Sequence, residues 1–300
     1  MNEILVIGSI NTDLVLRAER FPSPGETIQA GEISTYPGGK GANQAVAAAR
    51  QGARVGMIGR VGTDRYGDEL IENLKDNGVD TSLVKRDEAP TGTAIVVVDA
   101  QGQNSIVVSP GANAKVVPED VEITSLINLE AVLFQLEVPL ETVTHGCELA
   151  RKHGAMVLLN PAPARALPDE MYANIDCLLP NETELSLLSG KAVKDVGSAK
   201  EAAQVLLEQG VPAVVVTLGA KGSLVVTKDG ATHIPPFEVK VLDTTGAGDA
   251  FIGGFAAALL QGKTPEEAAR YGNACGALAT TKQGAQSSLP TREEVERLLA

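Results

Sequence analysis

Cysteine and histidine are scarce in this chain of 300 residues, which has three of each. Cys147, Cys177 and Cys275 are odd in number, lie far apart and form no Cys-x-x-Cys pair, which argues against a disulfide framework or a structural zinc site. Buried free thiols in a reducing cytosol are the simpler interpretation. No His-x-x-x-His pair occurs either, so we expect all three histidines to be structural or surface residues.

Basic clusters and long apolar runs are also missing. The formal net charge is −13 and no group of Lys or Arg residues stands out, which argues against nucleic acid or an anionic membrane as a partner. ATP is compatible with this charge, because backbone N–H groups and one or two cations suffice to bind phosphate. No apolar run approaches the roughly 20 residues of a membrane span. The first residues lack a basic region and a cleavage site, so we expect a cytoplasmic protein.

Short apolar runs alternate with helical stretches along a chain that is 44% hydrophobic. Runs rich in β-branched residues predict strands at residues 4–8, 55–59, 131–135, 156–160, 177–180, 214–218 and 224–227. Helices are predicted at residues 42–51, 67–77, 140–153, 199–209, 250–261, 265–282 and 292–299. This alternation predicts one α/β domain over residues 1–300, with a doubly wound, mostly parallel sheet. Ligands of such sheets bind beyond the carboxyl ends of the strands.

Two stretches break the α/β rhythm. Residues 13–36 contain strand-like pieces around residues 14–16 and 27–29. Residues 92–109 are typical of a hairpin, with a turn at residues 100–103. We expect both stretches to form a small separate β-sheet.

The sequence VLDTTGAGDAF (residues 241–251) is the most informative motif. An apolar strand end meets a Gly-rich turn that opens into a helix, where unpaired N–H groups and the helix dipole favour an anion. Gly246 and Gly248 allow close approach of the backbone. Asp249 beside such a cradle suits an enzyme that deprotonates a hydroxyl as it attacks a phosphoryl group. Taken alone, the motif is equally consistent with Asp249 as a helix N-cap.

Other motifs accompany it in a fixed order: PGGKGANQA (37–45), NPAPA (160–164), PNETE (180–184) and KQGAQSSLP (282–290). Together they resemble the signatures of the ribokinase family of sugar kinases, from about residue 5 to residue 295. The resemblance implies a ribokinase-like fold in which the small β-sheet is a lid over the sugar. It also implies that Asp249 is the catalytic base and that Gly246, Ala247 and Gly248 form the anion hole.

The sugar side follows strand one and opens the first predicted helix, which starts at residue 42. The resemblance implies sugar contacts from Asn11, Asp13, Gly39, Lys40, Gly41, Ala42, Asn43, Glu137 and Asp249. Asn11 and Asp13 are equally typical of turn residues. Lys40 is also consistent with a solvated side chain in a Gly-rich loop, and Glu137 with an ordinary surface residue.

The nucleotide side has neither a Walker A motif nor a Gly-x-Gly-x-x-Gly fingerprint. The resemblance implies ATP contacts from Asn181, Thr217, Leu218, Gly219, Ala220, Lys221, Gly222, Gly248 and Asn273. Asn181 and Glu184 would also organise the water shell of Mg²⁺, which typically keeps several waters. A helix N-cap at Asn181, with acids in the first turn, is an alternative that is compatible with this role.

A third group of residues lies around the anion hole. The resemblance implies a K⁺ or similar monovalent cation, bound partly through backbone carbonyls, at Asp243, Thr245, Ala279, Lys282, Gly284 and Ser288. Lys282 would contribute its carbonyl and not its charged side chain. Carbonyl ligands leave no residue-type signature, so the resemblance alone suggests this site.

We therefore expect an ATP-dependent phosphotransferase that acts on a small sugar, with D-ribose at O5 as the preferred acceptor and Mg²⁺ as cofactor. Other kinases of the family, acting on fructose, a deoxysugar or a nucleoside, are the nearest alternatives. A non-catalytic sugar or nucleotide sensor would not need a base at Asp249. A nicotinamide oxidoreductase would need a fingerprint where GSIN (residues 8–11) stands. The lid is too small to cover its own apolar positions, which predicts a homodimer.

Overall fold

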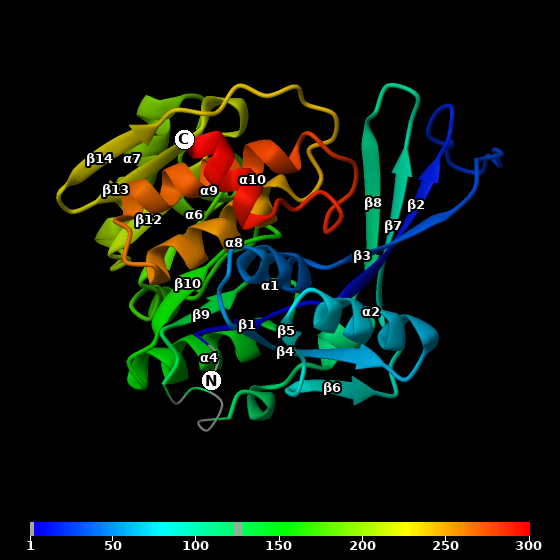
Figure 1. Cartoon of the computed structure of the whole chain (residues 1–300), viewed down its shortest axis with the longest axis horizontal. Coiled ribbons are helices and arrows are strands. Elements are labelled where there is room, and N and C mark those ends of the chain that lie inside the picture. Colours follow the sequence, from blue (N-terminus) through cyan, green and yellow to red (C-terminus); the bar gives the residue numbers. More distant parts are fainter. Residues whose placement is uncertain (1–2, 123–125, 127) are drawn as a thin grey trace.

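A computed structural model describes residues 3–122, 126 and 128–300 of the chain. Figure 1 shows a large sheet flanked by helices and a smaller sheet beside it. The large sheet has the strand order β14-β13-β12-β11-β10-β9-β1-β4-β5, and β6 also pairs with β4. Its strands are β1 (Ile4–Ile7), β4 (Val55–Gly62), β5 (Val79–Asp80), β6 (Val84–Asp87), β9 (Ala131–Phe134), β10 (Met156–Leu159), β11 (Cys177–Leu178), β12 (Ala213–Thr217), β13 (Ser223–Thr227) and β14 (Gly230–Ile234).

Helices cover both faces of this sheet. The α-helices are α1 (Lys40–Arg50), α2 (Arg65–Asp76), α4 (Leu140–Lys152), α5 (Asp169–Tyr172), α6 (Glu182–Ser189), α7 (Val196–Glu208), α8 (Ala247–Leu260), α9 (Pro265–Ala279) and α10 (Arg292–Leu299). The 3-10 helices are η1 (Gly111–Lys115), η2 (Pro118–Asp120) and η3 (Gly219–Lys221).

Strand β1 shows how the core divides. Ile4 and Val6 pack into one buried cluster with α1, α8 and α9, whereas Leu5 and Ile7 pack into a second cluster with α4 and α7. Side chains of a strand alternate between its faces, so a strand buried on both faces reads as a continuous apolar run. The expected doubly wound, mostly parallel fold is confirmed. The antiparallel pairs β12–β13 and β13–β14 end the sheet on one side.

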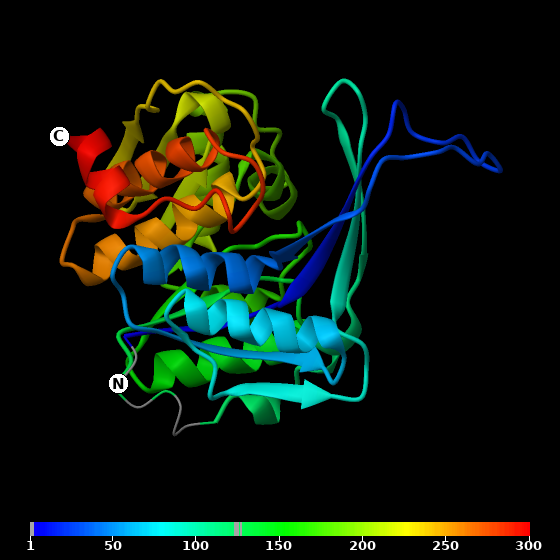
Figure 2. The ribbon, with the colours of Figure 1, turned by 45° about the vertical axis from the view of Figure 1, so that its right-hand side comes forward.

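The small sheet has the order β3-β2-β7-β8 and is built from β2 (Asn11–Arg17), β3 (Ser34–Gly38), β7 (Gly92–Val98) and β8 (Asn104–Ser109). It stands away from the body of the molecule, and the connection between β2 and β3 extends beyond it (Figure 2). Its base lies where β2 leaves the end of β1 and β3 leads into α1, as Asn11 pairs with Gly38 and Gly92.

Several predicted boundaries were wrong. Helices α1, α2 and α8 begin two or three residues before the predicted starts, because their glycines take part in the first turn. Helix α9 ends at Ala279, not at residue 282. Residues 27–29 form no strand. The partner of β2 is instead β3, which lies directly before α1. Strands β5, β6 and β14 were not predicted; β5 and β6 are short and carry charged residues.

Candidate active site

Helix α1 begins against the turn that joins β1 to β2. Gly39 has φ +89°, and a Cβ there would lie 2.7 Å from the backbone nitrogen of Asn11. A Cβ on Gly41 would lie 2.6 Å from the backbone nitrogen of Ser9. The backbone N–H of Ala42 donates to the carbonyl of Ser9 at 2.9 Å. Only glycine permits this approach, so the GGKG sequence places the start of α1 at the carboxyl end of β1.

Glu137 ties this helix start to the loop after β9. Its carboxylate accepts hydrogen bonds from the hydroxyl of Ser9 at 2.5 Å and from the backbone N–H of Lys40 at 3.0 Å. Glu137 therefore faces the site and is not an ordinary surface residue.

Asp249 lies in the first turn of α8 and is only 8% exposed. Its Oδ2 accepts from Nδ2 of Asn43 and its Oδ1 accepts from Nε2 of Gln44, both at 2.9 Å. The N-cap of α8 is Gly246, with φ +76°, and no side-chain cap is present there. The alternative in which Asp249 is only an N-cap is therefore wrong, because its carboxylate is directed at α1 and not at its own helix.

The start of α8 leaves backbone donors open. Among the described residues, the N–H groups of Gly248 and Asp249 have no hydrogen-bond partner. A Cβ built on Gly248 meets no atom within 4 Å. Open donors beside open space at a helix N-terminus are the features that a phosphate group requires.

Four further charged groups share the site. Burial, together with the charges of Glu137 and Asp249, raises the pKa of Asp13 to about 7, and Lys40 offsets this only in part. Burial also acts against the Lys40 ammonium, but Asp249, Glu137, Glu184 and Asp13 outweigh it, so the pKa of Lys40 is raised. Lys40 is thus a partly buried cation among carboxylates and not a fully solvated side chain.

The base of the small sheet is held by Asn113, which the sequence analysis missed. Its Nδ2 donates to Oδ1 of Asn11 at 2.6 Å, and its Oδ1 accepts from the N–H of Ile10 at 2.9 Å. Asp13 lies over Gly38, where a Cβ would be 2.3 Å from the carboxylate. Asn11 and Asp13 lie in β2, and their side chains face η1 and β3 respectively, so neither is a simple turn residue.

On the other side of Asp249, Asn181 caps α6 in a capping box with Glu184. Glu184 accepts from the backbone N–H and the Nδ2 of Asn181, at 2.8 and 2.9 Å. Burial, together with the charge of Asp249, raises the pKa of Glu184 despite the opposing effects of the Asn181 backbone bond and of Lys40. The remaining oxygen lone pairs have the hard-donor chemistry that Mg²⁺ prefers.

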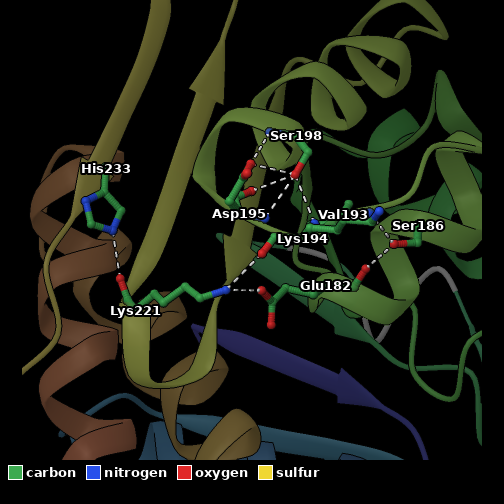
Figure 3. Close-up of polar contacts among 8 residues, drawn as sticks. All are labelled: Glu182, Ser186, Val193, Lys194, Asp195, Ser198, Lys221 and His233. Atoms are coloured by element: carbon green, nitrogen blue, oxygen red, sulfur yellow. Dashed lines mark hydrogen bonds and ion pairs between the residues drawn. The ribbon is translucent and has the colours of Figure 1, made fainter.

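The loop of residues 217–222 follows β12 and contains η3. The side chain of Lys221 points back to the start of α6, where its Nζ lies 3.2 Å from Oε1 of Glu182 and donates to the carbonyl of Lys194 at 3.2 Å (Figure 3). His233 contacts the carbonyl of Lys221 at 2.7 Å. Asn273 donates to the carbonyls of Ile234 and Pro235, so its amide nitrogen fixes backbone beyond β14.

The residues expected around a monovalent cation lie behind the start of α8. Asp243 accepts from the N–H and hydroxyl of Thr245 and from the N–H of Gly284. Burial alone would raise the pKa of Asp243. These hydrogen bonds and the charge of Arg17 outweigh that effect, so the pKa is lowered. Lys282 pairs with Glu294 at 2.7 Å, which leaves its carbonyl as its contribution to any ion site.

Ala279 and Ser288 belong to the same region. Ala279 ends α9 and its carbonyl accepts from the N–H of Lys282, while the hydroxyl of Ser288 donates to the carbonyl of Ala285. The Asp243 carboxylate and the carbonyls of Ala279 and Ala285 each accept a protein hydrogen bond, and oxygen donors of this kind suit a hard monovalent cation. No cluster of three or more His, Cys, Asp or Glu residues suited to a metal occurs in the described part of the chain.

Three buried polar residues that the sequence patterns did not reveal are linked to Asp249 by hydrogen bonds: Gln44, Gln135 and Asn160. Gln44 donates to Asn160 as well as to Asp249, and Gln135 donates to Gln44. The available signal was a polar side chain in an otherwise apolar setting: Gln44 lies in an Ala-rich helix, and Gln135 and Asn160 each follow an apolar strand.

A family model of the pfkB family of carbohydrate kinases matches residues 1–292. The chain belongs to the pfkB carbohydrate kinase family. Ribokinase from Staphylococcus aureus is 42% identical over 302 residues, covering 99% of both chains. Deoxyribokinase from Salmonella typhimurium is 41% identical over 302 residues, again covering 99% of both.

Solved structures agree with this assignment. Ribokinase from Arabidopsis thaliana, in complex with ribose and ATP, superposes with a TM-score of 0.93 at 36% identity and covers 99% of this chain and 98% of its own. A putative ribokinase II from E. coli, in complex with ATP and Mg²⁺, superposes with a TM-score of 0.84 at 25% identity, covering 100% and 99%. The chain is therefore an ATP-dependent carbohydrate kinase. Within its described residues, none of the helices is long and apolar enough to cross a membrane.

Proposed function

We propose that this kinase transfers the γ-phosphoryl group of ATP to O5 of D-ribose. The observation that carries the proposal is the buried carboxylate of Asp249, held by two side-chain amides next to open N–H donors at the start of α8. A fixed base beside an anion cradle suits in-line transfer to a hydroxyl.

In this mechanism Asp249 takes the proton of the attacking hydroxyl. The N–H groups of Gly246 and Gly248 stabilise the charge on the transferring group, whereas the N–H of Ala247, also expected in the anion hole, donates to the carbonyl of Thr244 at 3.2 Å. Asn181 and Glu184 would hold the water shell of Mg²⁺ bound with ATP, and the ion would supply positive charge to neutralise the phosphates. The residues 217–222 and Asn273 line the ATP groove, and the small sheet closes over the sugar to exclude water.

The sugar is bound by acceptors and donors around the start of α1. Asn43 Oδ1 is buried without a partner among the described residues, which leaves an acceptor for a sugar hydroxyl. Asn11, Asp13 and Glu137 supply further oxygens, and Gly39 to Ala42 supply backbone contacts. A polyhydroxylated ligand satisfies such a set, since a buried unpaired acceptor is costly.

A kinetic panel tests the substrate. We expect kcat/KM for D-ribose to exceed that for D-fructose or adenosine by a wide margin, because hydrogen-bonding sites reject substrates that leave buried groups unpaired. A nucleoside or fructose at the top of the ranking would contradict the ribose proposal but leave the family assignment unchanged.

2-Deoxyribose is the second candidate acceptor, because the relatives include a deoxyribokinase at 41% identity. It differs from ribose by one hydroxyl, so its rate separates the two candidates. A ribose pocket should prefer ribose over 2-deoxyribose by at least about tenfold in kcat/KM, and the reverse order would favour deoxyribose.

We also infer a monovalent cation site at Asp243, Thr245, Ala279, Lys282, Gly284 and Ser288. It is supported by the oxygen-rich loop packed behind Gly246, where a Cβ would lie 3.0 Å from Ala285. A cation there would fix the anion hole without touching the substrate. Activity should rise severalfold when K⁺ replaces tetramethylammonium at constant ionic strength, and a flat response would contradict the site.

Finally, we infer a homodimer through the small sheet. Ile95, Ile106, Val107 and Val108 are 46 to 67% exposed on β7 and β8. Ile95 and Val107 pair on one face of the sheet, and Ile106 and Val108 lie on the other, so apolar side chains are exposed on both faces. A second copy packed on the face of Ile95 and Val107 provides a self-complementary partner. Light scattering should give twice the chain mass of 31.1 kDa. Charged substitutions at Ile95 or Val97 should lower that mass and weaken sugar binding together; a fully active monomer would contradict the dimer.

A further inference from the structure

Gln44 is completely buried in α1 and has no role in the mechanism above. Its Nε2 donates to Oδ1 of Asp249 at 2.9 Å and to Oδ1 of Asn160 at 3.0 Å. Its Oε1 accepts from Nε2 of Gln135 at 2.7 Å. The side-chain amide of Gln44 thus uses both N–H groups and its carbonyl.

The acceptor-only chemistry of Asp249 determines how Gln44 is oriented. An ionised carboxylate accepts hydrogen bonds and donates none, so the atom of Gln44 that faces it must be the NH₂ group. The carbonyl of Gln44 then points to Gln135. By the same argument Asn43 presents its NH₂ group to Oδ2 of Asp249.

Asn160 and Gln135 connect this arrangement to the central sheet. Asn160 follows β10, and its Nδ2 donates to the carbonyl of Leu179 at 2.9 Å, after β11. Gln135 directly follows β9. Gln44 is therefore anchored to residues that follow two adjacent strands, and a shift of its amide would break several buried hydrogen bonds at once.

We propose that Gln44 is a positioning residue for Asp249: it fixes the plane of the carboxylate and favours its ionised form. Asn43 holds the other oxygen, but in the mechanism above it also faces the sugar, whereas Gln44 contacts only protein groups. The inference rests on the proposed role of Asp249 as the base. Charge-assisted bonds from two neutral donors hold an anion in place without adding a competing charge to the site.

Gln51, the C-cap at the other end of the same helix, provides a matched control. It is as buried as Gln44, and its amide is paired: Nε2 donates to the carbonyl of Pro290 and Oε1 accepts from the hydroxyl of Tyr271. Gln44→Met and Gln51→Met each remove a buried amide of similar size. They differ in whether the lost donor faces Asp249.

We expect Gln44→Met to lower kcat by about 10- to 100-fold, with the KM for ATP changed by less than about threefold, because the donor acts on the reacting carboxylate. The acid limb of its pH–rate profile should move to higher pH, since a carboxylate that loses a donor ionises less readily. Gln51→Met should keep kcat per folded molecule within about twofold. Equal losses in the two variants, or an unshifted acid limb, would overturn the inference.

Gln44→Glu is a second test that preserves side-chain size and the acceptor for Gln135. Two carboxyl groups within hydrogen-bond distance share one proton, and both ionise only at higher pH. While the pair keeps one proton, the new carboxyl can donate to Asp249 as the amide does; once both are ionised, they repel each other and Asp249 loses this donor. The activity of this variant should therefore fall as pH rises from about 6 to 9, unlike that of the native enzyme. A native-like profile would overturn the inference.

A double-mutant cycle separates this inference from the proposed function. If Gln44 acts through Asp249, adding Gln44→Met to Asp249→Asn should cause no further loss of kcat. Additive losses would place Gln44 outside the action of the base. Near-normal activity of Asp249→Asn alone would instead remove the base itself, whatever the result for Gln44.

Discussion

The two sides of the site are held together in different ways. The base cluster (Asn43, Gln44, Gln135, Asn160 and Asp249) is buried, and its side chains bond to one another across long sequence separations. The nucleotide loop (residues 217–222) relies on backbone conformation, with Gly219 at φ +55° and Gly222 at φ +86°, and on one ion pair. Its side-chain anchor is exposed, since Lys221 and Glu182 are 51% and 36% accessible.

The difference follows from what each side must do. A hydrogen bond to a charged group contributes about 1.5–3 kcal/mol, whereas an exposed ion pair contributes about 0–1 kcal/mol. Proton transfer needs a fixed carboxylate, so the base cluster uses the strong type of contact. If residues 217–222 bind phosphates through backbone groups, as we propose, this loop does not depend on one surface pair.

The largest expected effect tests the base cluster directly. Asp249→Asn keeps the size of the side chain but removes the base, so kcat should fall at least about 10²-fold with a modest change in sugar affinity. The new amide also places an NH₂ group against Asn43 or Gln44, both of which are donors there. Sugar affinity measured by calorimetry provides the control for folding. Near-normal turnover would remove Asp249 from the mechanism.

Gly248→Ala should cause the next largest effect, because it adds a methyl group to the open space beside the free N–H donors. We expect kcat/KM for ATP to fall by about tenfold or more, while the melting temperature stays unchanged or rises, since alanine favours a helix. Gly41→Ala is the contrasting variant: its Cβ would lie 2.6 Å from the Ser9 nitrogen, so it should also lower the melting temperature. Full activity in Gly248→Ala would place the phosphate elsewhere.

The third prediction concerns pH on the sugar side of the base cluster. Burial is the main cause that raises the pKa of Asp13 to about 7. Below that pH the carboxyl is protonated, so it accepts hydrogen bonds from sugar hydroxyls less well. The KM for ribose should rise about tenfold as pH falls from 8 to 6, because only the ionised fraction binds. A KM that is flat over this range would contradict the shifted pKa.

The same group affects stability with a defined sign. The folded state keeps the Asp13 proton up to about pH 7, whereas the unfolded chain releases it near pH 4, so this carboxyl costs stability as pH rises through that window. Asp13→Asn should therefore unfold at a higher temperature than the native enzyme above pH 7. The difference should shrink toward pH 4, while ribose binding is weakened throughout.

Sequence patterns predicted the two regions unequally. Apolar runs placed the central strands, and the Gly-rich motifs placed Gly39, Gly41, Gly246 and Asp249 at helix starts. They did not reveal Gln44, whose partner Asp249 is 205 residues away, nor Asn113, whose partner Asn11 is 102 residues away. Such contacts depend on which strand ends meet, and that information lies in the folded topology and not in local spacing.

The smallest expected effect is at the nucleotide loop and completes the comparison. Lys221→Ala removes the ion pair to Glu182 and the bond to the Lys194 carbonyl (Figure 3). Because the pair is exposed, we expect the KM for ATP to rise by less than about threefold and kcat to stay within about twofold. Lys228→Ala, an exposed lysine between β13 and β14, removes the same charge without a side-chain contact among the described residues and controls for net charge. Steady-state kinetics at two salt concentrations separate the effects, since an exposed pair weakens with salt. A loss as large as that of Gln44→Met would mean that Lys221 acts on ATP itself, and the contrast between a buried base cluster and a loosely anchored loop would fail.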